Sequence, residues 1–215
     1  MAAKKPAPQR ELPDLLEDTD DLDPREIVDG EAVDDAYVSS GDFSGKTLSP
    51  LVVRRSVISA VSFTGGQIKS VRLKDVRFIR CDFSNAVLRG MEASRVEFID
   101  CKLMGVKALE CRMEDILFER CSGRYGQFQD GSALRSDFVE SQFEEADFRG
   151  VNLSHSRWTK SSLVRADLTG SKLQGCDLRG ADTEGLLVGA LDLQGAIVNP
   201  SQAMDFAKLL GLTVR

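Results

Sequence analysis

A five-residue periodicity runs through most of this chain without a change of phase, and it constrains the fold more than any other feature. Every fifth residue from position 38 to position 198 gives 33 positions, of which 20 are Leu or Phe. The residues two places before them are mostly small, and the flanking residues are mostly polar or charged. A period of five matches neither an α-helix nor a flat strand. It fits a chain that turns a corner every five residues, with one large and one small side chain pointing inward on each side.

Four such sides would close a square coil of 20 residues, and successive coils would stack at the spacing of parallel strands, about 4.8 Å. Residues 20 apart should then lie one above another, where like charges would repel. Two outward columns alternate in sign: Arg55, Asp75, Arg95, Asp115, Arg135 and Arg80, Asp100, Arg120, Glu140, Lys160. The inward column of Phe78, Phe98, Phe118, Phe138 and Trp158 predicts an aromatic ladder inside one face.

Three units carry a recognisable motif of a small residue, Asp or Asn, Leu or Phe, and two variable residues. They are Ala146-Asp147-Phe148-Arg149-Gly150, Ala166-Asp167-Leu168-Thr169-Gly170 and Cys176-Asp177-Leu178-Arg179-Gly180. Over about residues 36–200 the chain resembles the pentapeptide repeat family. The resemblance implies an all-β solenoid, a right-handed quadrilateral parallel β-helix of about eight 20-residue coils. The N-terminal half departs from the motif at its Asp or Asn position, where Arg72, Arg77, Val87 and Glu97 stand.

The ends of the chain differ from this repeat. Residues 1–35 combine acids with prolines and few large apolar side chains, which predicts a disordered acidic tail before a β-helix over 36–199. Residues 200–215 should form a capping helix and a short tail, because Asn199-Pro200 is a typical helix start and Gly211 a typical stop. One face of that helix would carry Ala203, Phe206, Ala207 and Leu210, which could cap the coil alone or also join two copies as a homodimer.

The net charge of −6 hides a strong segregation. Residues 1–37 carry −8, residues 46–95 carry +7, and residues 96–215 carry −4. The candidate basic surface consists of Arg54, Arg55, Lys69, Arg72, Lys74, Arg77, Arg80 and Arg89. The candidate acidic surface consists of Glu140, Glu144, Glu145 and Asp147. The acidic tail could lie across the basic half of the rod and mask it, a contact that salt would weaken.

Few residues of this chain are suited to catalysis. The five cysteines Cys81, Cys101, Cys111, Cys121 and Cys176 all occupy the small inward position, which favours a packing role over metal or redox chemistry. His155 belongs to an outward corner column, with no nucleophile and orienting carboxylate beside it. We therefore expect no catalytic residue, no metal and no cofactor. The odd number of cysteines, the lack of a secretory signal and the lack of a long apolar run predict a cytoplasmic protein without a membrane partner.

Four small residues interrupt the large inward register within a short stretch: Ala93, Ala108, Gly123 and Ala133. They predict either a local distortion of the rod or refilling of the core by neighbours such as Leu109, Leu117 and Leu134.

Two functions from different classes follow. The first is a non-enzymatic scaffold that presents a rigid, charge-patterned rod to a macromolecular partner, with nucleic acid as one candidate ligand of the basic half. The alternative comes from the resemblance, since members of this family imitate DNA, bind DNA gyrase and protect it from quinolone-type poisons. Duplex DNA carries one charge per about 1.7 Å, and the repeat region with its mixed charge matches that density poorly.

Overall fold

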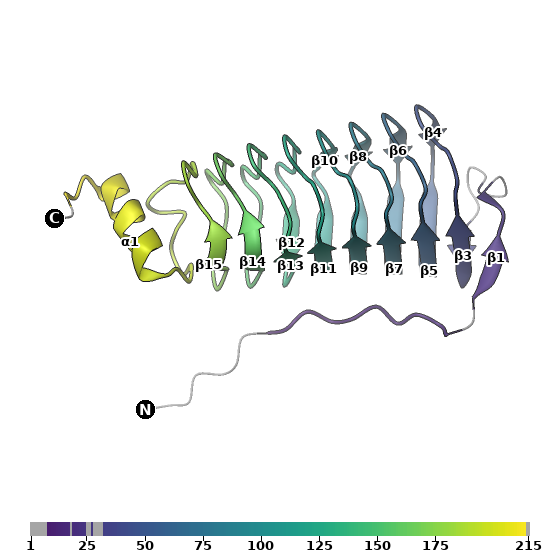
Figure 1. Cartoon of the computed structure of the whole chain (residues 1–215), viewed down its shortest axis with the longest axis horizontal. Coiled ribbons are helices and arrows are strands. Elements are labelled where there is room, and N and C mark those ends of the chain that lie inside the picture. Colours follow the sequence, from purple (N-terminus) through teal and green to yellow (C-terminus); the bar gives the residue numbers. More distant parts are fainter. Residues whose placement is uncertain (1–7, 18, 25–26, 28–31, 214–215) are drawn as a thin grey trace.

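The computed structural model describes residues 8–17, 19–24, 27 and 32–213. They form a parallel β-solenoid of about eight turns that ends in a short helix (Figure 1), which confirms the predicted fold class. No helix in the described part of the chain is long and apolar enough to cross a membrane.

Each coil has four faces, which we number by their inward residue in the first coil. Face 1 is centred on Val38, face 2 on Phe43, face 3 on Leu48 and face 4 on Val53, and each recurs every 20 residues. Faces 4 and 1 share long strands that continue around one corner: β5 (Leu51–Ser59), β7 (Val71–Ile79), β9 (Glu92–Ile99) and β11 (Arg112–Glu119). Face 3 carries β4 (Thr47–Leu48), β6 (Gln67–Lys69), β8 (Val87–Arg89) and β10 (Lys107–Leu109). Face 2 is joined by isolated parallel bridges such as Asp42 to Ser62 and Ser62 to Asp82.

The strand pattern changes beyond β11. The next coil splits its part of the long sheet into β12 (Ser132–Leu134) and β13 (Asp137–Val139), and the later coils contribute β14 (Arg157–Ser162) and β15 (Asp177–Asp182). The parallel register continues with an offset of 20 from Phe98 to Phe118, Phe138 and Trp158. The stacking of like positions therefore survives the region of small core residues.

The corner between faces 4 and 1, here the 4–1 corner, repeats a single conformation. Its residues Arg55, Asp75, Arg95, Asp115 and Arg135 have φ between 42° and 59°. This left-handed conformation is unfavourable for residues with a Cβ, so the stacked coils on either side must hold it in place. The result is a straight column of alternating charges on the outside of the rod, as the sequence predicts.

The core consists of the large inward register. All its positions from Val38 to Leu178 are buried, including the small residues at 93, 108, 123 and 133. The predicted aromatic ladder is confirmed: the ring centroids of Phe98 and Phe118 lie 5.1 Å apart, and those of Phe138 and Trp158 lie 3.7 Å apart. At Gly123 the space is taken by Phe143, whose ring lies 2.3 Å from where a Cβ would stand. Refilling from the next coil thus accounts for this exception, though not through the leucines we expected.

The N-terminal region contains two strands of the solenoid that the sequence does not predict. Strand β1 (Asp20–Leu22) pairs with β3 (Ala36–Ser39), and β2 (Ala32–Asp34) pairs with β5. Leu22 and Ile27 pack partly buried against the core. Residues 20–24 and 32–35 thus help to close the first coil, where the sequence places a disordered tail. The expectation of disorder for residues 1–7, 18, 25–26 and 28–31 lies outside the described residues.

Candidate functional site

The eight residues of the candidate basic surface do not form one patch. Three of them, Arg54, Arg72 and Lys74, lie together on face 4, where they line one groove. The other five lie at corners or on other faces, and three of these are held in ion pairs. Those pairs are Arg55 with Asp35 at 2.5 Å, Arg77 with Glu97 at 2.7 Å and Arg89 with Glu110 at 2.5 Å.

The face 4 groove is a depression of about 520 Å³ across five successive coils. Arg112, which the sequence analysis did not select, joins Arg54, Arg72 and Lys74 in its lining. Three acids oppose these four bases: Glu92 and Glu114 in the lining, and Asp34, which lies 3.6 Å from the Arg54 guanidinium. Glu92 lies 3.6 Å from the Arg72 guanidinium and 3.5 Å from that of Arg112. The groove therefore keeps an excess of positive charge, and its apolar walls include the small residue Ala93.

The four residues of the candidate acidic surface belong to one coil, where they are spread over faces 2 and 3 and two corners, and each has a basic partner. Glu140 pairs with Lys160 at 3.1 Å, and Glu144 pairs with Arg124 at 2.9 Å. Glu145 pairs with Arg165 at 2.7 Å, and Asp147 pairs with Arg149 at 2.6 Å. These acids therefore form rows of ion pairs along the rod rather than a strip of uncompensated negative charge.

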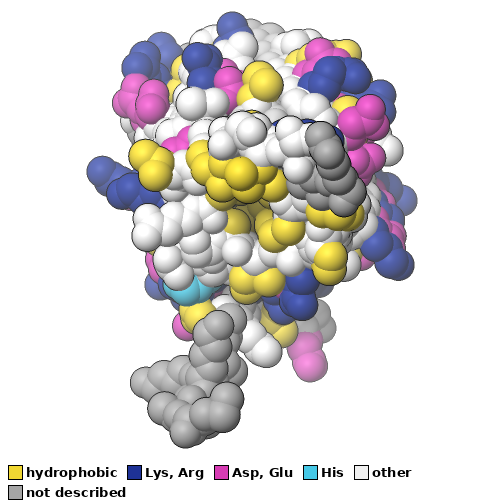
Figure 2. Space-filling model, turned by 90° about the vertical axis from the view of Figure 1, so that its left-hand side faces the viewer, with side chains coloured by type: hydrophobic (Ala, Val, Ile, Leu, Met, Phe, Trp, Pro, Cys, Tyr) yellow, Lys and Arg dark blue, Asp and Glu magenta, His cyan; other side chains and the backbone are white. Residues whose placement is uncertain are grey.

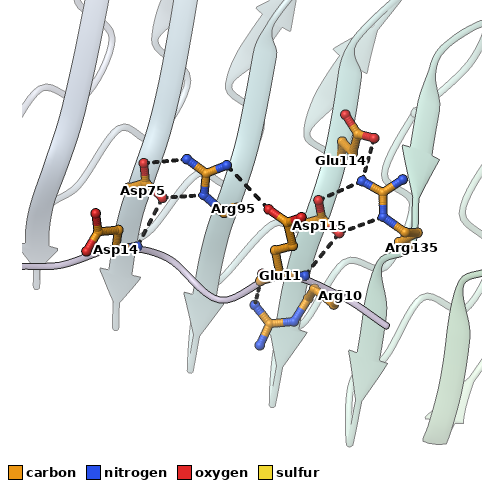
Figure 3. Close-up of polar contacts among 8 residues, drawn as sticks. All are labelled: Arg10, Glu11, Asp14, Asp75, Arg95, Glu114, Asp115 and Arg135. Atoms are coloured by element: carbon orange, nitrogen blue, oxygen red, sulfur yellow. Dashed lines mark hydrogen bonds and ion pairs between the residues drawn. The ribbon is translucent and has the colours of Figure 1, made fainter. Parts of the chain in front are cut away.

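Residues 8–17, here called the strap, run along the outside of the rod beside the 4–1 corner (Figures 1 and 3). The backbone N–H of Glu11 donates to Asp115 Oδ1 at 3.1 Å, and that of Asp14 donates to Asp75 Oδ1 at 3.0 Å. The Glu11 carboxylate lies 3.6 Å from the guanidinium of Arg95, which stands between those two acids in the column. The strap thus contacts the column of alternating charges mainly through its main-chain N–H groups.

The Arg10 side chain of the strap is largely covered by the rod. This side chain is 8 % exposed, and its guanidinium donates to Glu97 at 3.2 Å and lies 3.7 Å from Asp137. Both acids are on face 1, two coils apart, and both also pair with an arginine of the rod, Arg77 and Arg157. The contact of the tail with the rod is therefore not simply acid on base, because its anchor is an arginine between carboxylates.

The Asp75 carboxylate, which accepts one of these bonds, is held in its charged form by the rod itself. Arg95 donates from Nε and Nη2 to the two oxygens of Asp75, at 2.6 and 2.8 Å. Burial alone would favour the neutral acid. The bonds from Arg95 and from the Asp14 N–H outweigh it and lower the pKa of the Asp75 carboxyl below its ordinary value. Asp75 is thus a buried carboxylate that stays charged near neutral pH. Arg10, Glu11 and Asp14 are not among the residues predicted from the sequence. Pro8 and Pro13, which favour an extended chain, were the available signal.

The C-terminal cap matches its prediction closely. Helix α1 (Pro200–Ala207) starts from the N-cap Asn199, and a one-turn helix η2 (Lys208–Leu210) ends at Gly211 with φ of 73°. Gln202, the buried residue of α1, is not among the residues predicted from the sequence. Its Nε2 donates to the carbonyls of Leu178 at 2.8 Å and Ala181 at 3.0 Å, which joins the helix to the last strand.

Ala203, Phe206, Ala207 and Leu210 do share one side of the helix, as expected. With Ala190, Leu193, Ala196 and Val198 they line an apolar groove of about 300 Å³. Figure 2 shows apolar side chains gathered on this end of the molecule. Leu210 is 66 % exposed, so the cap does not cover all of its own apolar surface.

The remaining candidates lie where the repeat places them. All five cysteines are free and buried, and the thiols of Cys81, Cys101 and Cys121 donate to main-chain carbonyls of the preceding coil. Burial raises the pKa of the Cys111 thiol to about 11. His155 stands at the 4–1 corner with φ of 62°. Among the described residues, no group of three or more His, Cys, Asp or Glu side chains is arranged to hold a metal ion.

Comparisons with known proteins agree with this architecture. The model for a pentapeptide repeat region matches residues 71–148, and the model for pentapeptide repeats in eight copies matches residues 146–182. No curated protein matches the sequence.

The similar solved structures match at low sequence identity and with TM-scores below 0.5. QnrB1, a plasmid-mediated fluoroquinolone resistance protein, is 20 % identical with a TM-score of 0.46, over 92 % of this chain and 98 % of that chain. HetL, a pentapeptide repeat protein involved in heterocyst differentiation regulation from the cyanobacterium Nostoc sp. strain PCC 7120, is 13 % identical with a TM-score of 0.36, over 88 % and 92 %. Taken together, the five-residue register, the stacked coils and the two family matches show that the chain belongs to the pentapeptide repeat proteins.

Proposed function

We propose that this protein is a non-enzymatic scaffold whose face 4 groove binds an anionic macromolecular partner. The observation that carries the proposal is the gathering of Arg54, Arg72, Lys74 and Arg112 around one depression, against the three acids Asp34, Glu92 and Glu114. The side chain of Arg72 is 74 % exposed and that of Arg112 is 81 % exposed, so both reach solvent although each also faces Glu92. Exposed ion pairs of this kind are weak, and a polyanion can compete for their arginines.

The acidic N-terminal region regulates access to this groove in the proposal. Asp14 of the strap lies beside the 4–1 corner, which borders this groove, and its main-chain N–H donates to Asp75 there. Its influence is electrostatic, so salt would weaken it. Removing residues 1–17, which leaves β1 and β2 in place, should therefore strengthen binding of a polyanion to the groove.

Retention on a heparin column measures this proposal. We expect the variant Arg72→Ser with Lys74→Ser to elute at clearly lower salt than the wild type, because both bases leave the groove. The variant Lys160→Ser with Lys172→Ser is the control, since it removes the same charge from exposed positions of the later coils. Equal elution of the two variants would mean that the groove has no special part in binding.

A second copy of the chain is the proposed partner of the C-terminal end. The apolar groove beside α1 is open, and Leu210 contributes exposed apolar surface to it. We expect Leu210→Asp to shift the protein toward a monomer in sedimentation velocity, because a charge cannot be buried in such a contact without a partner. Met204→Asp is the control, since Met204 is 50 % exposed on the same helix and does not line the groove. A wild type that sediments as a monomer at high concentration would contradict the dimer.

The alternative function, DNA mimicry, requires a different surface from the scaffold role. Binding to gyrase by mimicry needs a strip of uncompensated negative charge, whereas Glu140, Glu144, Glu145 and Asp147 each pair with a base. A supercoiling assay with DNA gyrase, with and without a quinolone, distinguishes the two functions. We expect no effect at micromolar protein; protection from the quinolone would favour the alternative.

A further inference from the structure

The strap contacts the rod in a regular spacing. Its two main-chain donors, from Glu11 and Asp14, are three residues apart, and their acceptors Asp115 and Asp75 are two coils apart. Three residues of extended chain span about 9.3–9.9 Å. Two coils at the parallel-strand spacing span about 9.6 Å. The length of three extended residues therefore matches the height of two coils. An extended chain laid along this corner meets a carboxylate at every third residue.

Most of this recognition uses groups that any peptide carries. Main-chain N–H donors are common to all residues other than proline. The side-chain part consists of an arginine between Glu97 and Asp137 and an acid facing Arg95, as Figure 3 shows in part. We call the set of Asp75, Arg95, Glu97, Asp115 and Asp137 the corner track.

The strap does not use the corner track fully. The Arg10 side chain is 8 % exposed, and its Nε is buried without a hydrogen-bond partner among the described residues. It lies 3.7 Å from Asp137, too far for a hydrogen bond of ordinary length. A buried donor without an acceptor weakens a contact. The strap is thus an imperfect ligand, held in place partly because it is tethered to the rod.

We propose that the corner track is a binding site for an extended, arginine-bearing segment of another protein, which the strap occupies in cis as a competing ligand. The partner segment would place its arginine between Glu97 and Asp137 and would donate from main-chain N–H groups three residues apart to Asp115 and Asp75. This inference rests on the proposed scaffold role, but it involves the 4–1 corner and not the face 4 groove.

The test uses the full chain with a protease site inserted between Glu17 and Asp20. The protein is folded, cleaved and dialysed to remove the strap, and unfolding curves before and after cleavage show whether the rod stays intact. The probe is a fluorescein-labelled peptide of residues 8–17, and binding is followed by fluorescence anisotropy. Because the tethered strap competes at a high effective concentration, we expect the cleaved rod to bind the peptide at least about tenfold more tightly than the uncleaved chain.

Three altered peptides test what the track recognises. A glycine inserted between Leu12 and Pro13 keeps every residue of the parent peptide but breaks the three-residue spacing, and it should weaken binding at least about tenfold because the two hydrogen bonds cannot form together. The peptide Arg10→Ala should lose binding to a similar degree. An alanine-based peptide that keeps only Arg10 and Pro13 should bind within about tenfold of the parent, because main-chain recognition is tolerant of sequence.

In the rod, Glu97→Gln removes the acceptor charge for the arginine and should weaken the peptide, whereas Glu140→Gln, off the track, should not. The proposal is overturned if the cleaved rod shows no saturable binding, or if the spacing variant binds as well as the parent. It is also overturned if the alanine-based peptide does not bind, since the track would then be dedicated to the strap. Self-association that disappears on cleavage would identify a second copy as the occupant and overturn it as well. Heparin retention is measured on the same samples. The proposal for the face 4 groove can therefore be contradicted while peptide binding to the corner track is still observed.

Discussion

Replacing Phe138 by alanine is expected to lower the free energy of unfolding by about 3–5 kcal/mol, the usual cost of truncating a buried aromatic side chain. Phe138 is 1 % exposed and stacks on Trp158 with ring centroids 3.7 Å apart. It also meets Phe118 at 5.1 Å and the edge of Phe143 at 5.3 Å. The stacked coils fix the positions of these neighbours, so they cannot move together to fill the space.

Denaturant unfolding followed by circular dichroism measures this loss. Tyr125→Ala is the control, because Tyr125 is 55 % exposed and its removal should change stability by no more than about 0.5 kcal/mol. Phe138→Leu should cost less than Phe138→Ala, because leucine occupies the equivalent position at Leu178. A loss below about 1 kcal/mol for Phe138→Ala would show that the ladder collapses into the gap, contrary to rigid packing.

The second large effect is expected at the C-terminal cap. Gln202→Leu should destabilise the cap by about 2–4 kcal/mol, because two main-chain carbonyls lose their donor and each unsatisfied buried group costs about 1–3 kcal/mol. Those carbonyls belong to Leu178 and Ala181, and Gln202 is 5 % exposed. Its side chain also completes the capping box with Asn199, so the start of α1 weakens as well.

Hydrogen exchange locates this effect. Amides of α1 and of the last coil should exchange faster in Gln202→Leu, while those of β7 and β9 should keep their protection, since a repeat fold can open from one end. Ser201→Ala, at an exposed position on the same helix, should leave the exchange unchanged. Uniform acceleration along the whole rod would contradict a cap that acts locally.

The repeat itself was predictable because the same constraint recurs in every coil. The register of Phe78, Phe98 and Phe118 and the ion pair of Asp100 with Arg120 both follow from an offset of 20 residues, and both are present. The helix start at Asn199 and its end at Gly211 were also readable, since caps are local signals within a few residues. One irregular position can be compensated elsewhere, as Phe143 does at Gly123, without disturbing the pattern.

The candidate surfaces were less predictable because net charge over a stretch of sequence says nothing about which face each side chain occupies. Arg55 and Arg77 belong to the basic half, yet they pair with Asp35 and Glu97 on different parts of the coil. Arg112 lies outside that half but lines the face 4 groove. A coil with four faces distributes neighbouring residues to different sides, so only the stacked structure shows which charges meet.

The amino-acid sequence alone therefore specifies a four-sided solenoid, its inward ladders and its capping helix, because each is written in short-range periodicity or in local caps. The course of the strap is a property of the tertiary structure. Its contacts join residues 61 and 104 positions apart, from Asp14 to Asp75 and from Glu11 to Asp115. They use main-chain donors that leave no mark on the sequence, and they occur once rather than in every coil. Only when the coils are stacked do corner carboxylates acquire the spacing that an extended chain can match.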